Sequence, residues 1–163
     1  MGRAALLLTL LLAAPARALP LGVSVSVSGG LGEARLAGPY RDDTTIGLSL
    51  LAGVHRHLAL RLTLLDSFER VQIEARLGAL LSLARAPSLR AYLIVEGGVV
   101  GASLVNTLEA RAGIGVAWRP PLGVLARWTA LYIESAASVR FARATQLGDT
   151  ITIGVAIVPP SLW

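Results

Sequence analysis

The feature that most constrains this chain is a two-residue alternation of apolar and polar side chains that recurs along most of its length. Leucine occupies every second position from Leu58 to Leu64, with Arg61 and Thr63 between them, and the same alternation resumes at Val71. Successive side chains of a β-strand point to opposite faces. The alternation therefore predicts strands with one apolar face and one polar or small face.

Eight segments show this pattern, so we expect eight strands. Two lie within residues 58–84, on either side of residues 66–70, and the other six are residues 21–29, 45–54, 89–97, 108–118, 124–132 and 150–158. Residues 69–85 also fit a helix, because they are rich in Ala, Leu, Glu and Arg and carry an apolar stripe at helical spacing. The strand is favoured because Gln72, Glu74 and Arg76 alternate strictly and the segments before and after are strands.

Composition points away from an ordinary soluble domain. Apolar residues make up 54% of the chain and charged residues 15%, whereas a soluble domain has about 25% charged residues. The sequence beyond residue 18 contains no run of 18 apolar residues, so it predicts no membrane-spanning helix. All 15 basic residues are arginines that occur singly along the chain, whereas a nucleic-acid interface needs a clustered basic patch, so we exclude nucleic acid as a partner. The chain has no cysteine and forms no disulfide.

Residues 1–18 have the features of a secretory signal peptide. A short positive start at Arg3 precedes an apolar run, residues 4–14, that Pro15 ends, and Ala16 and Ala18 occupy the positions expected before a cleavage site. The run is shorter than the roughly 20 residues of a spanning helix, which disfavours an uncleaved anchor. We therefore expect cleavage after Ala18 and one domain over residues 19–163.

The connections between the predicted strands alternate in length. Short turns are expected at residues 55–57, 85–88 and 119–122, and longer loops at residues 29–43, 97–106 and 134–149. The connection around residues 66–69 is the one short exception. Short turns at one end and long loops at the other are typical of outer-membrane barrels, whose short turns are periplasmic.

Periodicity alone does not say which face is outside, because a soluble barrel has the same period with its apolar face inside. We place the apolar face outside because Trp118, Trp128 and Tyr132 fall on it, as in an aromatic belt at the membrane interface. The other face carries small residues and charges that we expect to line a narrow lumen as a charge ladder: Arg61, Glu74, Arg76, Arg90, Glu96, Glu109, Arg111 and Arg127.

Two hairpin registers pair apolar with apolar residues and bring opposite charges together. A turn that pairs Asp66 with residue 69 places Arg61 directly opposite Glu74. A turn centred on Pro87 places Leu81 opposite Leu93, and Gly78 opposite Glu96. Facing opposite charges stabilise a sheet, and unpaired charges inside a lipid-surrounded barrel are costly. We interpret the charges as interior pairs and keep a solvated outer face of a soluble sheet as the alternative.

With these features the chain resembles the small eight-stranded bacterial outer-membrane β-barrel proteins over the whole of residues 19–163. The resemblance rests on the signal peptide, the eight alternating strands, the alternating loop lengths and the aromatic residue Trp163. It implies an all-β fold, an eight-stranded antiparallel up-and-down transmembrane β-barrel. The chain departs from the pattern at Pro159 and Pro160, which end the last predicted strand before Trp163. Residues 138–146 alternate in part and fit either a strand extension or an extra hairpin.

The same resemblance implies a place and a set of partners. The place is the outer membrane of the cell envelope of a Gram-negative bacterium. The partners are outer-membrane lipid and, during biogenesis, periplasmic chaperones and the outer-membrane assembly machinery. We expect a monomer and count Trp163 with Trp118, Trp128 and Tyr132 as interface aromatics.

The sequence contains no recognisable set of catalytic or metal-binding residues. His55 and His57 share a strand face, but no carboxylate lies near them and Arg56 separates them. An outer-membrane lipid-modifying enzyme would need its histidine near the outer leaflet, whereas both histidines fall in a predicted periplasmic turn. The sequence predicts a structural or surface-interaction barrel without catalysis, cofactor or metal. The alternatives are a soluble periplasmic barrel that binds an apolar ligand and a lipid-modifying outer-membrane enzyme.

Overall fold

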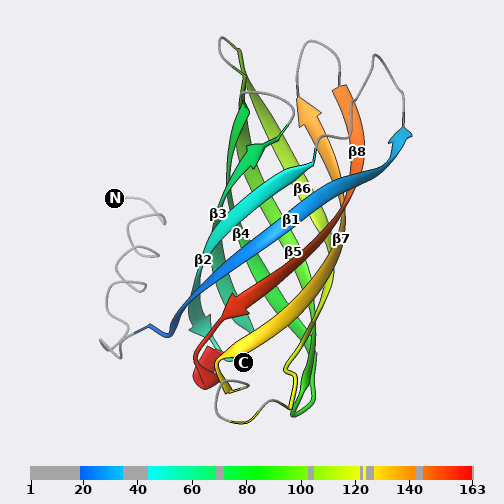
Figure 1. Cartoon of the computed structure of the whole chain (residues 1–163). Helices are drawn as coiled ribbons and strands as arrows, with labels where there is room; N and C mark the ends of the chain where they lie inside the picture. Colours follow the sequence, from blue (N-terminus) through cyan, green and yellow to red (C-terminus); the bar gives the residue numbers. More distant parts are fainter. Residues whose placement is uncertain are drawn as a thin grey trace, which may run out of the picture.

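A computed structural model describes residues 19–34, 44–68, 72–102, 105–121, 123, 127–141 and 145–162 (Figure 1). The signal-peptide prediction, residues 1–18, and the predicted interface residue Trp163 lie outside the described residues. The strands are β1 (Leu21–Ala34), β2 (Thr45–His55), β3 (Leu58–Ser67), β4 (Gln72–Arg85), β5 (Leu89–Ala102), β6 (Val105–Trp118), β7 (Thr129–Phe141) and β8 (Thr145–Ile157), followed by a short 3-10 helix η2 (Pro160–Leu162). No helix in the described residues is long and apolar enough to cross a membrane.

The eight strands form one closed antiparallel barrel in which each pairs with its neighbours in sequence and β1 pairs with β8. Closure leaves no free sheet edge, which is the condition for a sheet to stand in lipid. Most of the large apolar side chains face outward, and Leu62, Ile114 and Ile153 keep 44%, 59% and 61% of their surface exposed. The buried polar side chains that face inward are serines, threonines, arginines and glutamates. The predicted fold class, an eight-stranded antiparallel barrel with its apolar face outside, is confirmed.

Residues 72–85 form strand β4, so the strand prediction is confirmed over the helical alternative. The predicted β4–β5 register is also confirmed, with Leu81 opposite Leu93 and Gly78 opposite Glu96. The turn itself differs from the prediction, because Arg85 pairs with Arg90 and not with Leu89. An irregularity in the pairing between Ser82 and Ala84 then restores the predicted register for the rest of the hairpin.

The predicted β3–β4 register is wrong. Asp66 pairs with Ile73, and Arg61 faces Gly78 rather than Glu74. The shift preserves the apolar-to-apolar pairing that guided the prediction, because a slip by an even number of residues keeps every side chain on the same face. Alternation therefore fixed the faces of this hairpin but not its register.

The seventh strand begins later than predicted. It runs from Thr129 to Phe141 instead of ending at Tyr132, and β6 sets its register by pairing Trp118 with Leu131 and Gly115 with Glu134. Residues 138–141 continue β7 and residues 145–149 belong to β8, so this region is a strand extension and not an extra hairpin. The segment 124–132 alternates as well as 129–141 does, and pairing with β6 selects the second.

The connections do not follow the predicted alternation of short and long. Only residues 103–104 separate β5 from β6, and only residues 142–144 separate β7 from β8, because these strands continue through the predicted loops. The connection from β6 to β7, residues 119–128, is longer than the predicted turn. In Figure 1 the β2–β3, β4–β5 and β6–β7 connections share the lower end of the barrel with η2, which we call the η2 end.

Candidate functional site

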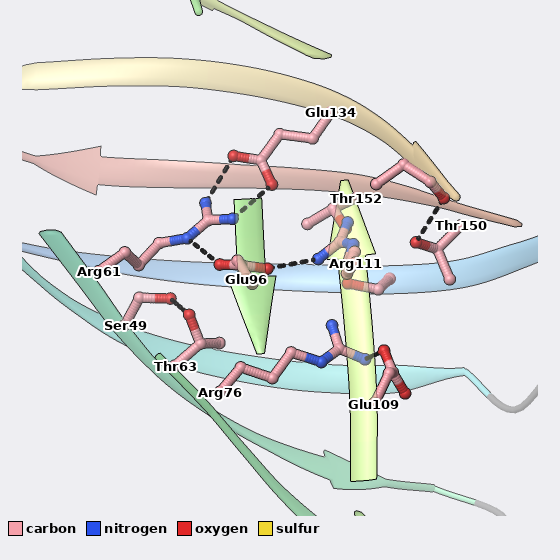
Figure 2. Close-up of polar contacts among 12 residues, drawn as sticks. Ser49, Arg61, Thr63, Arg76, Glu96, Glu109, Arg111, Glu134, Thr150 and Thr152 are labelled. Carbon is pink, nitrogen blue, oxygen red and sulfur yellow. Dashed lines mark hydrogen bonds and ion pairs between the residues drawn. The ribbon is translucent and has the colours of Figure 1, made fainter. Parts of the chain in front are cut away.

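The centre of the barrel interior holds a buried network of two arginines and two glutamates, which we call the central network (Figure 2). Arg61 donates from Nε to Glu96 at 2.7 Å and from its two terminal nitrogens to both carboxylate oxygens of Glu134. Arg111 donates to the other oxygen of Glu96 at 3.2 Å and to the Thr152 hydroxyl at 3.1 Å. All four charged side chains are 5% exposed or less. The fork-shaped Arg61 guanidinium fits this two-carboxylate site as a lysine would not.

A second group of four charges lies beside the first, which we call the ring network. Arg76 contacts Glu74 at 2.6 Å and Glu109 at 3.1 Å, and Arg140 contacts the same two glutamates at 2.9 and 2.6 Å. The four ion pairs close a ring of alternating charge. Each network contains two positive and two negative groups, so each is neutral, which limits the cost of burying its charges.

Glycines explain how these side chains reach one another across the sheet. In the row across β3, β4 and β5, Gly78 stands between Arg61 and Glu96. A Cβ at Gly78 would collide with the Glu96 side chain, so the missing side chain opens the path. The same arrangement recurs with Gly98 between Arg76 and Glu109, with Gly115 between Tyr92 and Glu134, and with Gly154 between Tyr132 and Ser26.

The two tyrosines use these gaps for hydrogen bonds inside the barrel. The Tyr92 hydroxyl donates to Glu134 at 2.9 Å, and the Tyr132 hydroxyl donates to Ser24 at 3.3 Å. They separate the central network from an apolar cluster at the η2 end, built from Leu51, Ala59, Leu80, Ile94, Ala117, Ala130, Ala156, Val158 and Leu162. The interior is therefore charged in its middle and apolar at one end.

The segment around η2 closes the apolar end. Leu162 is 5% exposed and its carbonyl accepts a hydrogen bond from Arg90 at 2.6 Å, while Arg90 Nε donates to the Ser82 hydroxyl. A cavity of about 50 Å³ remains between Leu162 and the central network. That is a small space beside the 300–1,000 Å³ of an ordinary ligand pocket.

Seven of the eight predicted interior charges lie inside the barrel and are buried. Six of these seven belong to the central or the ring network, and Arg90 lies apart from them near η2. The eighth, Arg127, was predicted wrongly, because it is exposed in the connection between β6 and β7. Tyr132 was also predicted wrongly as an interface aromatic, because it is 7% exposed and hydrogen-bonded inside. Both errors follow from the misplaced seventh strand. Trp118 and Trp128 are 43% and 49% exposed on the outside at the η2 end.

Sequence reasoning missed Glu134 and Arg140, which complete the two networks. Both fall in the region that was predicted as a loop, yet they alternate with Ile133, Ser135 and Val139 as inward residues should. It also missed Phe68 and Phe141, which are 67% and 55% exposed at the end opposite η2. The described exposed aromatics thus form two groups at the two ends of the wall, as in a pair of interfacial belts.

His55 and His57 lie at the β2–β3 turn with ring centroids 5.9 Å apart. Desolvation and the neighbouring positive charges of Arg56 and Arg85 lower the pKa of His57. The same positive charges repel a metal cation. Among the described residues no group of three metal-ligating side chains occurs.

Comparisons with solved structures identify the type of barrel. A structure described as "De novo design of transmembrane beta-barrels" matches with a TM-score of 0.59 over 85% of this chain and 94% of that one, at 16% identity. The fold is that of a small transmembrane β-barrel. The designed barrel TMB2.3, solved by NMR, matches with a TM-score of 0.55 over 87% of this chain and 97% of that one, at 11% identity.

A natural protein shows the same likeness. The N-terminal β-barrel domain of Pseudomonas aeruginosa OprF matches with a TM-score of 0.55 over 83% of this chain and 97% of that domain, at 10% identity. At these identities the likeness concerns the fold alone. No family model and no curated protein matches the chain.

Proposed function

We propose that this protein is a small barrel of the bacterial outer membrane, with a lumen filled by side chains and a structural or surface-interaction role without catalysis. The observation that carries the membrane placement is the outer wall. Many outward positions from Val23 to Ile157 hold large aliphatic side chains, most of them about half exposed. Exposing so much aliphatic surface to water is unfavourable by roughly 25 cal/mol per Å². Lipid removes that cost, which disfavours the alternative of a soluble periplasmic barrel.

The filled interior of the barrel supports a role other than transport. Eight strands enclose a space that side chains can just fill. The central and ring networks cross it with ion pairs of 2.5–3.2 Å, and Leu162 closes the η2 end. A filled interior supports a protein that acts through its surface. Partners in biogenesis, periplasmic chaperones and the assembly machinery, belong to the same proposal, as does a monomeric state.

The lipid-modifying enzyme is the weaker candidate. A serine hydrolase needs a histidine base within hydrogen-bond reach of its serine. His55 and His57 lie at the η2 end and are exposed, and within the described residues no hydrogen bond joins either one to a serine hydroxyl. Purified protein in mixed micelles with phospholipid should release no fatty acid above the level of protein-free micelles.

Fractionation tests the placement. The protein expressed with its first 18 residues in a Gram-negative host should sediment with the outer membrane and resist extraction by alkaline carbonate. Recovery in the soluble periplasm without detergent would contradict the proposal. Mass measurement of the membrane-bound protein tests cleavage after Ala18 in the same experiment.

A further inference from the structure

The η2 end of the barrel carries positively charged side chains that belong to neither the central nor the ring network. In the complete sequence, residues 44–65, 75–95 and 110–133 contain no aspartate or glutamate. Each of these ranges contains one of the three connections at the η2 end. The side chains at this end that carry or can carry positive charge are His55, Arg56, His57, Arg85, Arg119 and Arg127, which we call the basic rim. No aspartate or glutamate lies near Arg56, Arg85 or Arg127 in the sequence.

Backbone hydrogen bonds hold the three connections side by side. The Ser82 N–H donates to the His57 carbonyl and the Arg119 N–H donates to the Ser88 carbonyl, both at 2.8 Å. Arg85 lies directly opposite Arg90 in the β4–β5 pairing. Like charges in facing positions of a sheet repel each other. Among the described residues no ion pair reaches Arg56, Arg85 or Arg127, and all three are exposed. An external anion would relieve this repulsion.

Apolar and aromatic side chains beside the rim determine which anion fits. Trp118 and Trp128 are exposed at this end, and Leu83 and Leu89 on the adjoining strands are 59% and 45% exposed. Tryptophan marks the boundary between hydrocarbon and headgroups. The rim arginines therefore stand at headgroup depth, where clustered arginines attract anionic lipid. A water-soluble polyanion would gain nothing from the exposed apolar side chains beside the rim.

We propose that the basic rim binds the phosphate groups of anionic phospholipids in the leaflet at the η2 end and enriches these lipids around the barrel. The inference rests on the proposed membrane placement and adds a lipid preference to it. Trp118 and Trp128 would lie against the acyl chains and glycerol region of the same lipids, while Arg56, Arg85 and Arg127 contact their phosphates.

Tryptophan fluorescence measures this preference at the rim itself. The protein carrying Trp163→Phe, which leaves Trp118 and Trp128 as its tryptophans, is refolded into phosphatidylcholine vesicles that contain 20 mol % of either brominated phosphatidylglycerol or brominated phosphatidylcholine. Bromine quenches tryptophan on contact, so the quenching ratio reports relative lipid binding. We expect brominated phosphatidylglycerol to bind the rim at least threefold more strongly. Circular dichroism in vesicles of phosphatidylcholine alone shows separately whether the barrel folds in a membrane.

Two triple variants with the same net charge distinguish binding at the basic rim from non-specific attraction of a basic protein to anionic lipid. Arg56→Gln, Arg85→Gln and Arg127→Gln should reduce the preference to about one. The matched control replaces Arg35, Arg41 and Arg143, which lie in sequence between β1 and β2 and between β7 and β8, and should keep it. Equal quenching by the two lipids in the parent protein, or an equal loss in both variants, would overturn the proposal.

Competition distinguishes lipid from free phosphate. Replacing chloride by inorganic phosphate at constant ionic strength should leave the lipid preference unchanged, and abolition by phosphate would overturn the lipid assignment. Failure of the parent protein to fold in phosphatidylcholine vesicles would instead contradict the membrane placement. Quenching therefore tests the lipid preference, and circular dichroism of the same vesicles tests the membrane placement. A failure of one proposal can be distinguished from a failure of the other.

Discussion

At the scale of single residues, the molecule depends on charges that find partners across a neighbouring strand. Arg61 reaches Glu96 over Gly78 and binds Glu134 with both terminal nitrogens, and all of these charges are buried. Removing one member of a buried pair typically costs about 3–5 kcal/mol, because its partner keeps an uncompensated charge. The pairing is therefore open to measurement by mutation.

A double-mutant cycle tests which glutamate Arg61 depends on. Arg61→Met and Glu134→Met should each destabilise the barrel by about 3–5 kcal/mol, and the double variant should recover part of the loss, with a coupling above about 1 kcal/mol. Denaturant unfolding in vesicles measures both. The matched cycle of Arg61→Met with Glu74→Met should be additive within about 0.5 kcal/mol, because Glu74 belongs to the ring network. Stronger coupling to Glu74 would contradict the observed register, and a coupling to Glu134 that salt abolishes would place the pair in solvent.

The interior glycines give a second residue-scale prediction. A Cβ at Gly115 would stand 2.5 Å from ring atoms of Tyr92, whereas a Cβ at Gly29 would meet nothing within 4 Å. Gly115→Ala should therefore lower the free energy of unfolding by about 1–3 kcal/mol, as overpacking does. Gly29→Ala should be neutral or slightly stabilising. Unfolding curves of the two variants provide the comparison, and equal effects would mean that Tyr92 does not cross over Gly115.

At the scale of elements, strand β6 is long enough to cross the hydrocarbon layer of a membrane. Leu108 pairs with Phe141 near one end, and Trp118, ten positions further along, pairs with Leu131 at the other. A spanning strand needs about 9–11 residues. Ile114 thus lies near the middle of the lipid-facing band and Leu108 near its edge.

Depth along β6 should set the cost of a charge on the outer face. Ile114→Arg should destabilise the barrel in vesicles by about 2–4 kcal/mol, whereas Leu108→Arg should cost about 0–1 kcal/mol. Both side chains are about 60% exposed, so exposure alone does not distinguish them. Equal costs, measured by reversible denaturant unfolding, would mean that β6 does not cross the bilayer as its belts indicate.

At the scale of the whole molecule, the closed wall and the filled interior leave no path for ions through the barrel. The two networks span the middle and the apolar cluster with Leu162 fills one end. We expect no stepwise ionic current when the purified protein is inserted into a planar bilayer. Insertion is confirmed independently by protease protection. A steady open-channel conductance in the parent protein would contradict the filled lumen.

Much of the fold could be predicted from the sequence, and the errors at β7 and in the β3–β4 register have different causes. Alternation identified strands and faces correctly for segments such as 45–54 and 108–118, because burial on one face imposes a period of two. It misplaced β7, Arg127 and Tyr132 because residues 124–141 alternate in two overlapping ways. The candidate site was predicted as a set of interior charges without its central partner, Glu134, which lay in the misassigned region.

The amino-acid sequence was enough to predict a barrel with an apolar wall and an interior of small and charged side chains, with a soluble barrel as the alternative. It also shows the three acid-free segments, but only the up-and-down order of the strands places them at one end of the barrel. The tertiary structure decided which charges meet. Arg61 could have faced any inward position on β4, because slips by two residues keep every side chain on its face. Closure of all eight strands at once selects the register in which Gly78, Gly98 and Gly115 stand where long side chains must cross.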